Sequence, residues 1–123
     1  TTLSYLGAVR AIPGYHVMGP AKASLEATVR GLAVELAPTN TRVNAVSAGP
    51  IATLAAKGGI ANFGNMQEEM RLRAPLGNVT AEQVACTVTC LATQGTGITG
   101  QTIYVDGGYS IVGGPPPAAY SKD

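Results

Sequence analysis

TRVNAVSAGP, residues 41–50, decides the fold class, because it joins a short apolar run to a turn. β-branched and small apolar residues continue to Ala48, and Gly49 and Pro50 end the run. A short apolar run closed by glycine and proline is typical of a strand buried within a sheet. QTIYVDGG, residues 101–108, repeats this pattern. We therefore predict two such strands, and the first few residues of the chain are typical of the end of a third.

A helical pattern lies between the strand end at the start of the chain and the predicted strand at residues 41–50. From Tyr15 to about Ala37, apolar residues recur every three or four positions, at Val17, Ala21, Leu25, Val29, Leu32 and Leu36. This spacing predicts the longest helix of the chain, which Pro38 ends. Pro20 lacks the N–H that a helix interior requires, so we predict a late start or a kink there.

A second helix is predicted for TAEQVACTVTCLA, residues 80–92, with Thr80 as its N-cap. Residues 52–79 hold scattered glycines and a short charged stretch, which indicates a mobile loop with one short helix. The order is then strand end, helix, strand, loop, helix and strand. It predicts an α/β fold with a parallel sheet and right-handed crossovers.

The length of 123 residues suffices for one domain, which we place at residues 1–112. Residues 113–123 are rich in glycine and proline, and we expect a disordered tail there. Eight Lys and Arg against seven Asp and Glu give a net charge of +1. This balance lacks the basic footprint of a protein that binds nucleic acid or an acidic membrane surface, so neither partner is expected.

Apolar run lengths and cysteine spacing bear on the compartment and the redox state of the protein. No apolar run approaches the roughly 20 residues of a membrane span, and the first residues lack the features of a signal peptide. Cys86 and Cys90 stand four apart on the second predicted helix, where we expect two small buried side chains rather than a disulfide. These observations favour a soluble cytoplasmic protein. Thr1 in place of an initial Met suggests a piece of a longer chain.

GTGITG, residues 95–100, matches the glycine pattern of dinucleotide-binding proteins letter for letter. A phosphate-binding loop must follow a strand and open a helix, so that helical N–H groups face the phosphates. These glycines instead follow a predicted helix and lead into a strand, so we interpret them as a turn. A metal site is not expected either, because His16 is the only histidine and the two cysteines are helical neighbours.

The pair Tyr15 and Lys22 is the best candidate for chemistry. Seven positions make nearly two helical turns, which would place both side chains on one face about 10 Å apart. A neighbouring ammonium favours the ionised form of a phenol and strengthens it as a hydrogen-bond donor. The alternative, which the spacing alone favours, is an aromatic ring at an interface beside a solvated charge.

Three colinear stretches carry a family resemblance: LSYLGAVRAIPGYHVMGPAKASLEATVR, RVNAVSAGPIATLAA and GITGQTIYVDGGYSI. From about Thr1 to Ile111 they resemble the C-terminal half of the bacterial NADH-dependent enoyl-acyl-carrier-protein reductases of the FabI type. These are divergent short-chain dehydrogenases/reductases, so the resemblance implies the C-terminal portion of a Rossmann-like, doubly wound parallel sheet. The resemblance implies a role in fatty acid biosynthesis, with an enoyl-acyl carrier protein as substrate.

The spacing of the tyrosines distinguishes this family from its relatives. The wider superfamily has Tyr-x-x-x-Lys, but the fourth position after Tyr15 is Gly19, and the spacing here is Tyr-x6-Lys. Tyr5, ten residues before Tyr15, is a further feature of the enoyl reductases. Both details argue against the alternative of a 3-oxoacyl-acyl-carrier-protein reductase. Pro20 departs from the leucine or methionine expected in the family.

The resemblance implies a role for each candidate residue. Tyr15 would hydrogen-bond or protonate the thioester oxygen as negative charge develops there. Lys22 would hold the hydroxyls of the nicotinamide ribose, and Tyr5 would line the substrate side. The cofactor NADH/NAD would also contact Ile51, Ala52, Thr53, Leu54 and Ala55, which follow a predicted strand.

The remaining implications concern a lid, a turn and assembly. Residues 56–70, with Phe63 and Met66, would close over the acyl chain. Asp106 is interpreted as a turn-former rather than a catalyst. The last strand would lie near a subunit interface of a homotetramer. The glycine-rich nucleotide-binding half of the family is absent, so two hypotheses stand: half of an enoyl reductase, or a non-catalytic fragment that associates with itself or with a partner.

Overall fold

A three-stranded parallel sheet forms the centre of the computed structural model, which describes residues 1–59 and 62–114. Its strands are β1 (Thr2–Ser4), β2 (Ala45–Ala48) and β3 (Thr102–Val105). They lie in the order β1-β2-β3, and both neighbouring pairs are parallel. The predicted α/β class and parallel sheet are therefore confirmed.

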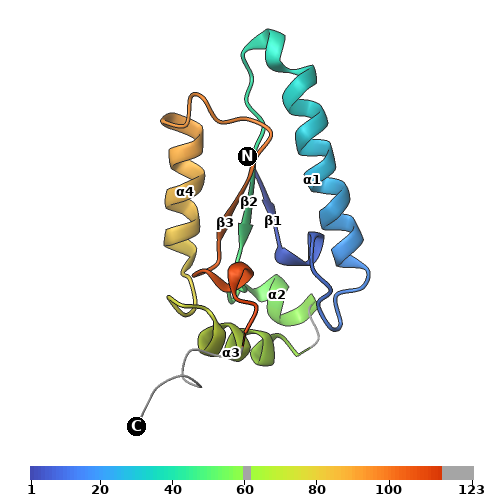
Figure 1. The fold of residues 1–123 in the computed structure, drawn as a ribbon, viewed down its shortest axis with the longest axis vertical. Coiled ribbons are helices and arrows are strands. Elements are labelled where there is room, and N and C mark those ends of the chain that lie inside the picture. The colour runs from blue at the N-terminus through green and yellow to red at the C-terminus, as the bar shows by residue number, and fades with distance from the viewer. Residues whose placement is uncertain (60–61, 115–123) are drawn as a thin grey trace.

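Two long helices cover opposite faces of this sheet, as Figure 1 shows. Val46 of β2 packs against Val84 and Leu91 of α4 (Ala81–Thr93). Neighbouring strand residues point to the other face, where Ser4 of β1 meets Glu26 of α1 (Met18–Glu35). The three layers form the doubly wound arrangement that the family resemblance implied.

The two connections between the strands have opposite hands. Both step in the same direction across the sheet, from β1 to β2 and from β2 to β3, yet α1 and α4 lie on opposite faces. The expectation of right-handed crossovers is therefore wrong for one of them. The reason lies in the long second connection, whose additional helices carry the chain around the carboxyl ends of the strands before α4 begins.

These additional helices are α2 (Leu54–Gly59) and α3 (Phe63–Arg73), and they lie beyond the carboxyl ends of the strands (Figure 1). The sequence predicted a mobile loop with one short helix over residues 52–79, so the helical content is higher than expected. α3 is anchored by Phe63 and Met70, which are both buried. Shorter 3₁₀ segments follow three of the elements, at Leu6–Ala8, Ala37–Thr39 and Tyr109–Ile111.

α1 starts late, as Pro20 predicted. The helix begins at Met18, so Pro20 lies in its first turn, where a missing N–H leaves no intrahelical bond unmade. Tyr15 therefore precedes the helix, and the expectation that it shares a helix face with Lys22 is wrong. The backbone of Tyr15 still meets the helix start, because the Gly19 N–H donates to the Tyr15 carbonyl at 2.8 Å.

The buried stripe of α1 is not the apolar one that the sequence suggested. Gly19, Glu26, Val29 and Ala33 are buried, with Lys22 half-buried on the same stripe. Val17, Ala21 and Leu32 of the apolar stripe are exposed. The sheet takes the face whose small residues permit close approach: a Cβ on Gly19 would lie 2.9 Å from the Gly7 carbonyl oxygen.

α4 begins with a capping box, which confirms Thr80 as its N-cap. The Gln83 N–H donates to Thr80 Oγ1, and the Thr80 N–H donates to Gln83 Oε1. Cys86 and Cys90, expected to be buried, are exposed. The core takes the opposite face of the helix, with Val84, Val88 and Leu91, and this leaves both thiols on the outside.

The two glycine-rich stretches are turns. Residues 95–100 connect α4 to β3, which confirms that they do not open a helix. Asp106 forms the turn after β3, since the N–H groups of Gly108 and Ser110 each donate to its carboxylate at 2.9 Å. Most of the expected tail, residues 115–123, lies outside the described residues. Within the described ranges, no helix has the length and hydropathy of a membrane span.

Candidate functional site

A groove of about 580 Å³ opens where β1 and β2 end. Parallel sheets place their ligands at this edge. The phenols of Tyr5 and Tyr15 and the ammonium-bearing chain of Lys22 come from the β1–α1 side. Ile51 and Thr53 follow β2, and Phe63 and Met66 belong to α3. The structure therefore brings together seven of the residues that the sequence singled out.

Tyr15 is fixed in this groove by its own burial and by a second ring. Its side chain is 7% exposed, and its ring lies edge to face against the ring of Tyr5. The position of Gly7 makes room for it: a Cβ there would lie 2.5 Å from Tyr15 Cδ1. Such a distance is a clash, so the close packing of Tyr15 depends on a residue without a side chain.

The electrostatics of the two phenols differ from the expectation. Burial raises the pKa of Tyr15 above the ordinary tyrosine value of 10.0. The pKa of Tyr5 is also raised, first by burial and then by the charged forms of Tyr109, Tyr15 and Glu69. Both phenols therefore carry their protons at neutral pH. The pKa of Tyr15 therefore shifts in the direction opposite to the one expected from a neighbouring ammonium, because burial disfavours the ionised phenol.

Lys22 has a definite partner in β1. Its Nζ donates to the carbonyl oxygen of Leu3 at 2.9 Å. An ammonium has three N–H groups, so two remain for a ligand in the groove. Paired ligand hydroxyls suit these two donors, which is the geometry that holding a ribose requires.

Residues 51–55, which were expected to contact the cofactor, differ in their surroundings. Ile51 packs against the α4 side of the core and also lines the groove. Thr53 lines the groove too, and its Oγ1 accepts a hydrogen bond from the Ala56 N–H at 3.0 Å. Ala52 is exposed, and Leu54, at the start of α2, is 92% exposed. Ala55 belongs to α2. Of the four whose side chains the structure describes, Ile51 and Thr53 line the groove.

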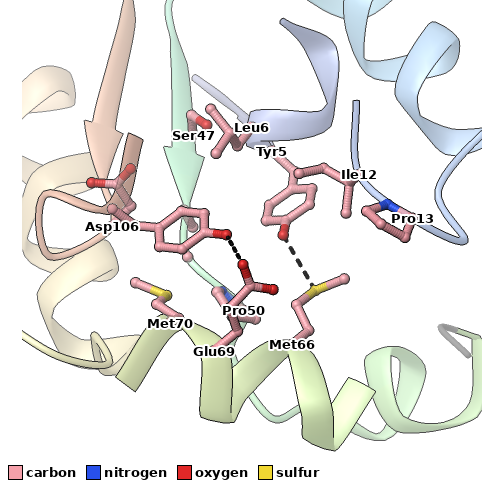
Figure 2. Close-up of a pocket in the computed structure, with 13 residues that line it drawn as sticks. Tyr5, Leu6, Ile12, Pro13, Ser47, Pro50, Met66, Glu69, Met70 and Asp106 are labelled. Atoms are coloured by element: carbon pink, nitrogen blue, oxygen red, sulfur yellow. Dashed lines mark hydrogen bonds between the residues drawn. The ribbon is translucent and has the colours of Figure 1, made fainter. Parts of the chain in front are cut away.

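A smaller cavity of about 120 Å³ lies behind Tyr5, and Figure 2 shows its lining. The Tyr5 hydroxyl donates to Met66 Sδ at 3.2 Å, and the Tyr109 hydroxyl donates to Glu69 Oε1 at 2.9 Å. Met70 packs beside them and is almost fully buried. Tyr5 and Met66 line both the small cavity and the main groove, so the two spaces adjoin.

The described part of the chain contains no set of ligands for a metal ion. No three side chains of His, Cys, Asp or Glu gather there in a way that could hold an ion. His16 lies in the turn before α1 and is exposed. The chemistry-bearing side chains that line the groove are the phenols of Tyr5 and Tyr15 and the ammonium of Lys22.

Two features of this region were not predicted from the sequence. The first is the buried pair Ser4 and Glu26, joined by a hydrogen bond of 2.5 Å. Its one sequence signal is a glutamate four residues after Lys22, on the same side of a predicted helix. The second is Gly7, for which the sequence offers no signal, because its contact with Tyr15 exists only in the folded chain.

Comparison with protein families gives a match over most of the chain. The family described as enoyl-(acyl carrier protein) reductase matches residues 1–110. Among curated proteins, the enoyl-(acyl-carrier-protein) reductase (NADH) FabI of Nostoc sp. is 56% identical over 116 residues. The protein of the same name from Neisseria meningitidis is 56% identical over 111 residues. These alignments cover 91% and 89% of this chain but only 44% and 42% of the relatives.

Solved structures give the same picture. The enoyl-acyl carrier protein reductase of Bacillus cereus, solved with NADP+ and indole naphthyridinone, is 49% identical, with a TM-score of 0.85. The FabI–NADH complex of Alistipes finegoldii is 33% identical, with a TM-score of 0.88. They cover 90% and 92% of this chain, and 44% and 40% of theirs. The chain thus matches a portion of a Rossmann fold and spans less than half the length of these relatives.

Proposed function

Since the chain belongs to the enoyl-(acyl carrier protein) reductase family, we propose that it carries the tyrosine and lysine part of an NADH-dependent enoyl reductase site. The substrate would be a trans-2-enoyl thioester of acyl carrier protein, as in fatty acid biosynthesis. One observation carries the proposal: Tyr5, Tyr15 and Lys22 line one groove at the carboxyl ends of the strands. Its shape and its donors fit a nicotinamide ribose beside an acyl thioester.

Tyr15 would act on the thioester oxygen. Reduced nicotinamide, when bound, supplies the hydride that reaches the β-carbon of the substrate. Negative charge then develops on the thioester oxygen, and a protonated phenol can donate a hydrogen bond or a proton to it. The phenol of Tyr15 carries its proton at neutral pH, because its pKa lies above the ordinary tyrosine value of 10.0. Tyr5 would line the substrate side and hold the Tyr15 ring in position.

Lys22 would position rather than transfer protons. One of its three N–H groups is taken by the Leu3 carbonyl, which orients the other two. Two donors fixed in this way suit the adjacent hydroxyls of a ribose. Ile51 and Thr53 would contact the nicotinamide side of the cofactor, together with backbone groups of Ala52, Leu54 and Ala55.

Residues 56–70 would close the groove over the acyl chain. Phe63 and Met66 already line it, and the Tyr5 hydroxyl contacts Met66. A lid in this position would exclude water from the developing charge and thereby strengthen the hydrogen bond from Tyr15.

A homo-oligomer is part of the proposal. α1 exposes Leu32 and Val34, with 42% and 75% of their surface open, and Val17, just before the helix, is 69% exposed. Apolar side chains at these positions suit contact with a second copy. Light scattering after gel filtration measures the mass of the particle. A monomer at every concentration would contradict the homo-oligomer, and the catalytic proposal would still be decided by the activity assay.

The decisive experiment follows consumption of NADH by its absorbance, with a trans-2-enoyl thioester as substrate. The chain is assayed alone and with the segment of the Nostoc relative that it does not cover, added as a separate polypeptide. A 3-oxoacyl thioester serves as the second substrate, because its reduction would indicate the alternative reductase.

Tyr15→Phe and Lys22→Met are the test variants, and Tyr104→Phe is the matched control, because Tyr104 lies in β3 and does not line the groove. We expect turnover of the enoyl substrate that Tyr104→Phe retains and Tyr15→Phe lowers about a hundredfold or more. If the chain neither binds NADH nor reduces the substrate, both alone and with the added polypeptide, it is a non-catalytic fragment and the proposal fails.

A further inference from the structure

A buried carboxylate lies next to the site without a part in the proposed chemistry. Glu26 of α1 is 6% exposed, and its Oε1 accepts the Ser4 hydroxyl at 2.5 Å. Ser4, the last residue of β1, is equally buried. Among the described residues, no lysine or arginine forms an ion pair with Glu26. A carboxylate is rarely buried with so little compensation unless its position matters.

Glu26 works together with Lys22, one turn earlier on the same stripe of α1. Lys22 Nζ donates to the carbonyl of Leu3, and Glu26 accepts from the side chain of the next residue, Ser4. Two side chains of opposite charge, four residues apart on α1, thus hold two consecutive residues of β1. Side chains four residues apart lie on one face of a helix, so both can reach the same strand.

This attachment controls the geometry of the site, because the phenols belong to different elements. Tyr5 directly follows Ser4, whereas Tyr15 is tied to the start of α1 through the Gly19 N–H. A shift of α1 along β1 would move Lys22 and Tyr15 together relative to Tyr5. The Ser4–Glu26 bond opposes that shift from inside the protein, where no water competes for it.

We propose that Glu26 is a positioning residue, whose bond to Ser4 holds the Leu3 carbonyl where it orients Lys22 and holds Tyr5 against Tyr15. The inference rests on the proposed function, since the purpose of the alignment is to present two N–H groups and a phenol to ligands. Glu26 itself touches neither substrate nor cofactor.

The test compares variants of the pair with a matched glutamate. Glu26→Ala and Ser4→Ala each remove the bond, whereas Glu26→Gln keeps an acceptor for the Ser4 hydroxyl. Glu35→Gln is the control, because Glu35 is exposed at the end of the same helix. The chain has three lysines, so ¹⁵N-lysine NMR at low temperature gives an uncrowded view of the Lys22 ammonium. Tyrosinate absorbance gives the phenol pKa values, and urea denaturation gives the stability.

In the wild type, the hydrogen bond to Leu3 should slow the exchange of the Lys22 ammonium protons with water and make their signal visible. We expect Glu26→Ala and Ser4→Ala to lose this signal and to shift the tyrosine pKa values toward the ordinary value of about 10. Glu26→Gln should retain both features, and Glu35→Gln should resemble the wild type. A purely structural role predicts lower stability with the Lys22 signal and the titration unchanged, and that result would overturn the proposal. If Glu26→Ala does not fold, Ser4→Ala, which removes only a hydroxyl, decides alone.

NADH affinity separates this inference from the proposed function. In the mixture that binds NADH, Ser4→Ala should weaken binding about tenfold or more, and Glu26→Gln should weaken it less. If the wild type fails to bind NADH, the proposed function fails while the NMR and titration results still decide whether Glu26 positions Lys22. If the wild type binds and both variants bind equally well, the positioning role is refuted on its own.

Discussion

The ring of Tyr15 lies edge to face against the ring of Tyr5, with the two centroids 5.0 Å apart and the planes inclined by 70°. Tyr5 follows the edge strand β1, and Tyr15 precedes the helix α1. The contact therefore joins the two elements at the point where the groove opens. Aromatic pairs in this geometry stabilise by about 0.5–1.5 kcal/mol beyond the area they bury.

Gly7→Ala should displace the Tyr15 ring. The added Cβ would lie 2.5 Å from Tyr15 Cδ1 and 2.8 Å from Cε1, so the ring must move. We expect a loss of about 1–3 kcal/mol in the free energy of unfolding by urea. Gly31→Ala is the control, because Gly31 lies within α1 with nothing near the new Cβ, and a gain of about 0.5–1 kcal/mol is expected. A Gly7→Ala variant as stable as the wild type would mean that Tyr15 is not packed there.

The buried phenols should make the fold sensitive to alkaline pH. The pKa values of Tyr5 and Tyr15 are raised in the folded state, so the unfolded chain loses these protons first. The stabilisation is fully present below the unfolded pKa of about 10 and declines as the pH rises beyond it. Urea unfolding at several pH values should give a shallower decline for a Tyr5→Phe/Tyr15→Phe variant than for the wild type. Parallel declines would contradict the burial of these hydroxyls.

Arg42→Lys should loosen the end of α4. The guanidinium of Arg42 donates to the carbonyl oxygens of Leu91, Ala92 and Gly95. A lysine ammonium lacks the planar fork that reaches three acceptors, so we expect a loss of about 1–3 kcal/mol in urea denaturation. Arg30→Lys, on the exposed side of α1, should change stability by less than about 0.5 kcal/mol. Similar values for the two variants would show that the Arg42 bonds contribute nothing.

Both thiols should react without unfolding. Cys86 and Cys90 are free and exposed on the outer face of α4. A chromogenic thiol reagent should titrate two equivalents in the native protein at rates near those of a free thiol, and one equivalent in Cys90→Ser. Labelling that requires denaturant would restore the sequence-based expectation of buried cysteines.

Much of the fold could be predicted, because its signals are local. Gly49 and Pro50 after an apolar run indicated β2, and Thr80 with Gln83 satisfies the first N–H groups of α4 within one turn. The position of the candidate site also followed, since strand ends meet at one edge of a parallel sheet. The burial of α1 did not follow: its apolar period pointed to Val17 and Leu32, but contact with the sheet depends on close approach at Gly19.

By itself the sequence determined the strand and helix order, the turn at Asp106 and the Tyr-x6-Lys spacing that indicates the family, because these depend on neighbouring residues and backbone chemistry. Only the tertiary structure decided that Tyr15 precedes α1 and that the two crossovers differ in hand. It also decided that Lys22 and Glu26 bind two consecutive residues of β1. It also decided the direction of the tyrosine pKa shifts. These properties arise from desolvation and contact between residues far apart in the chain, which no local pattern records.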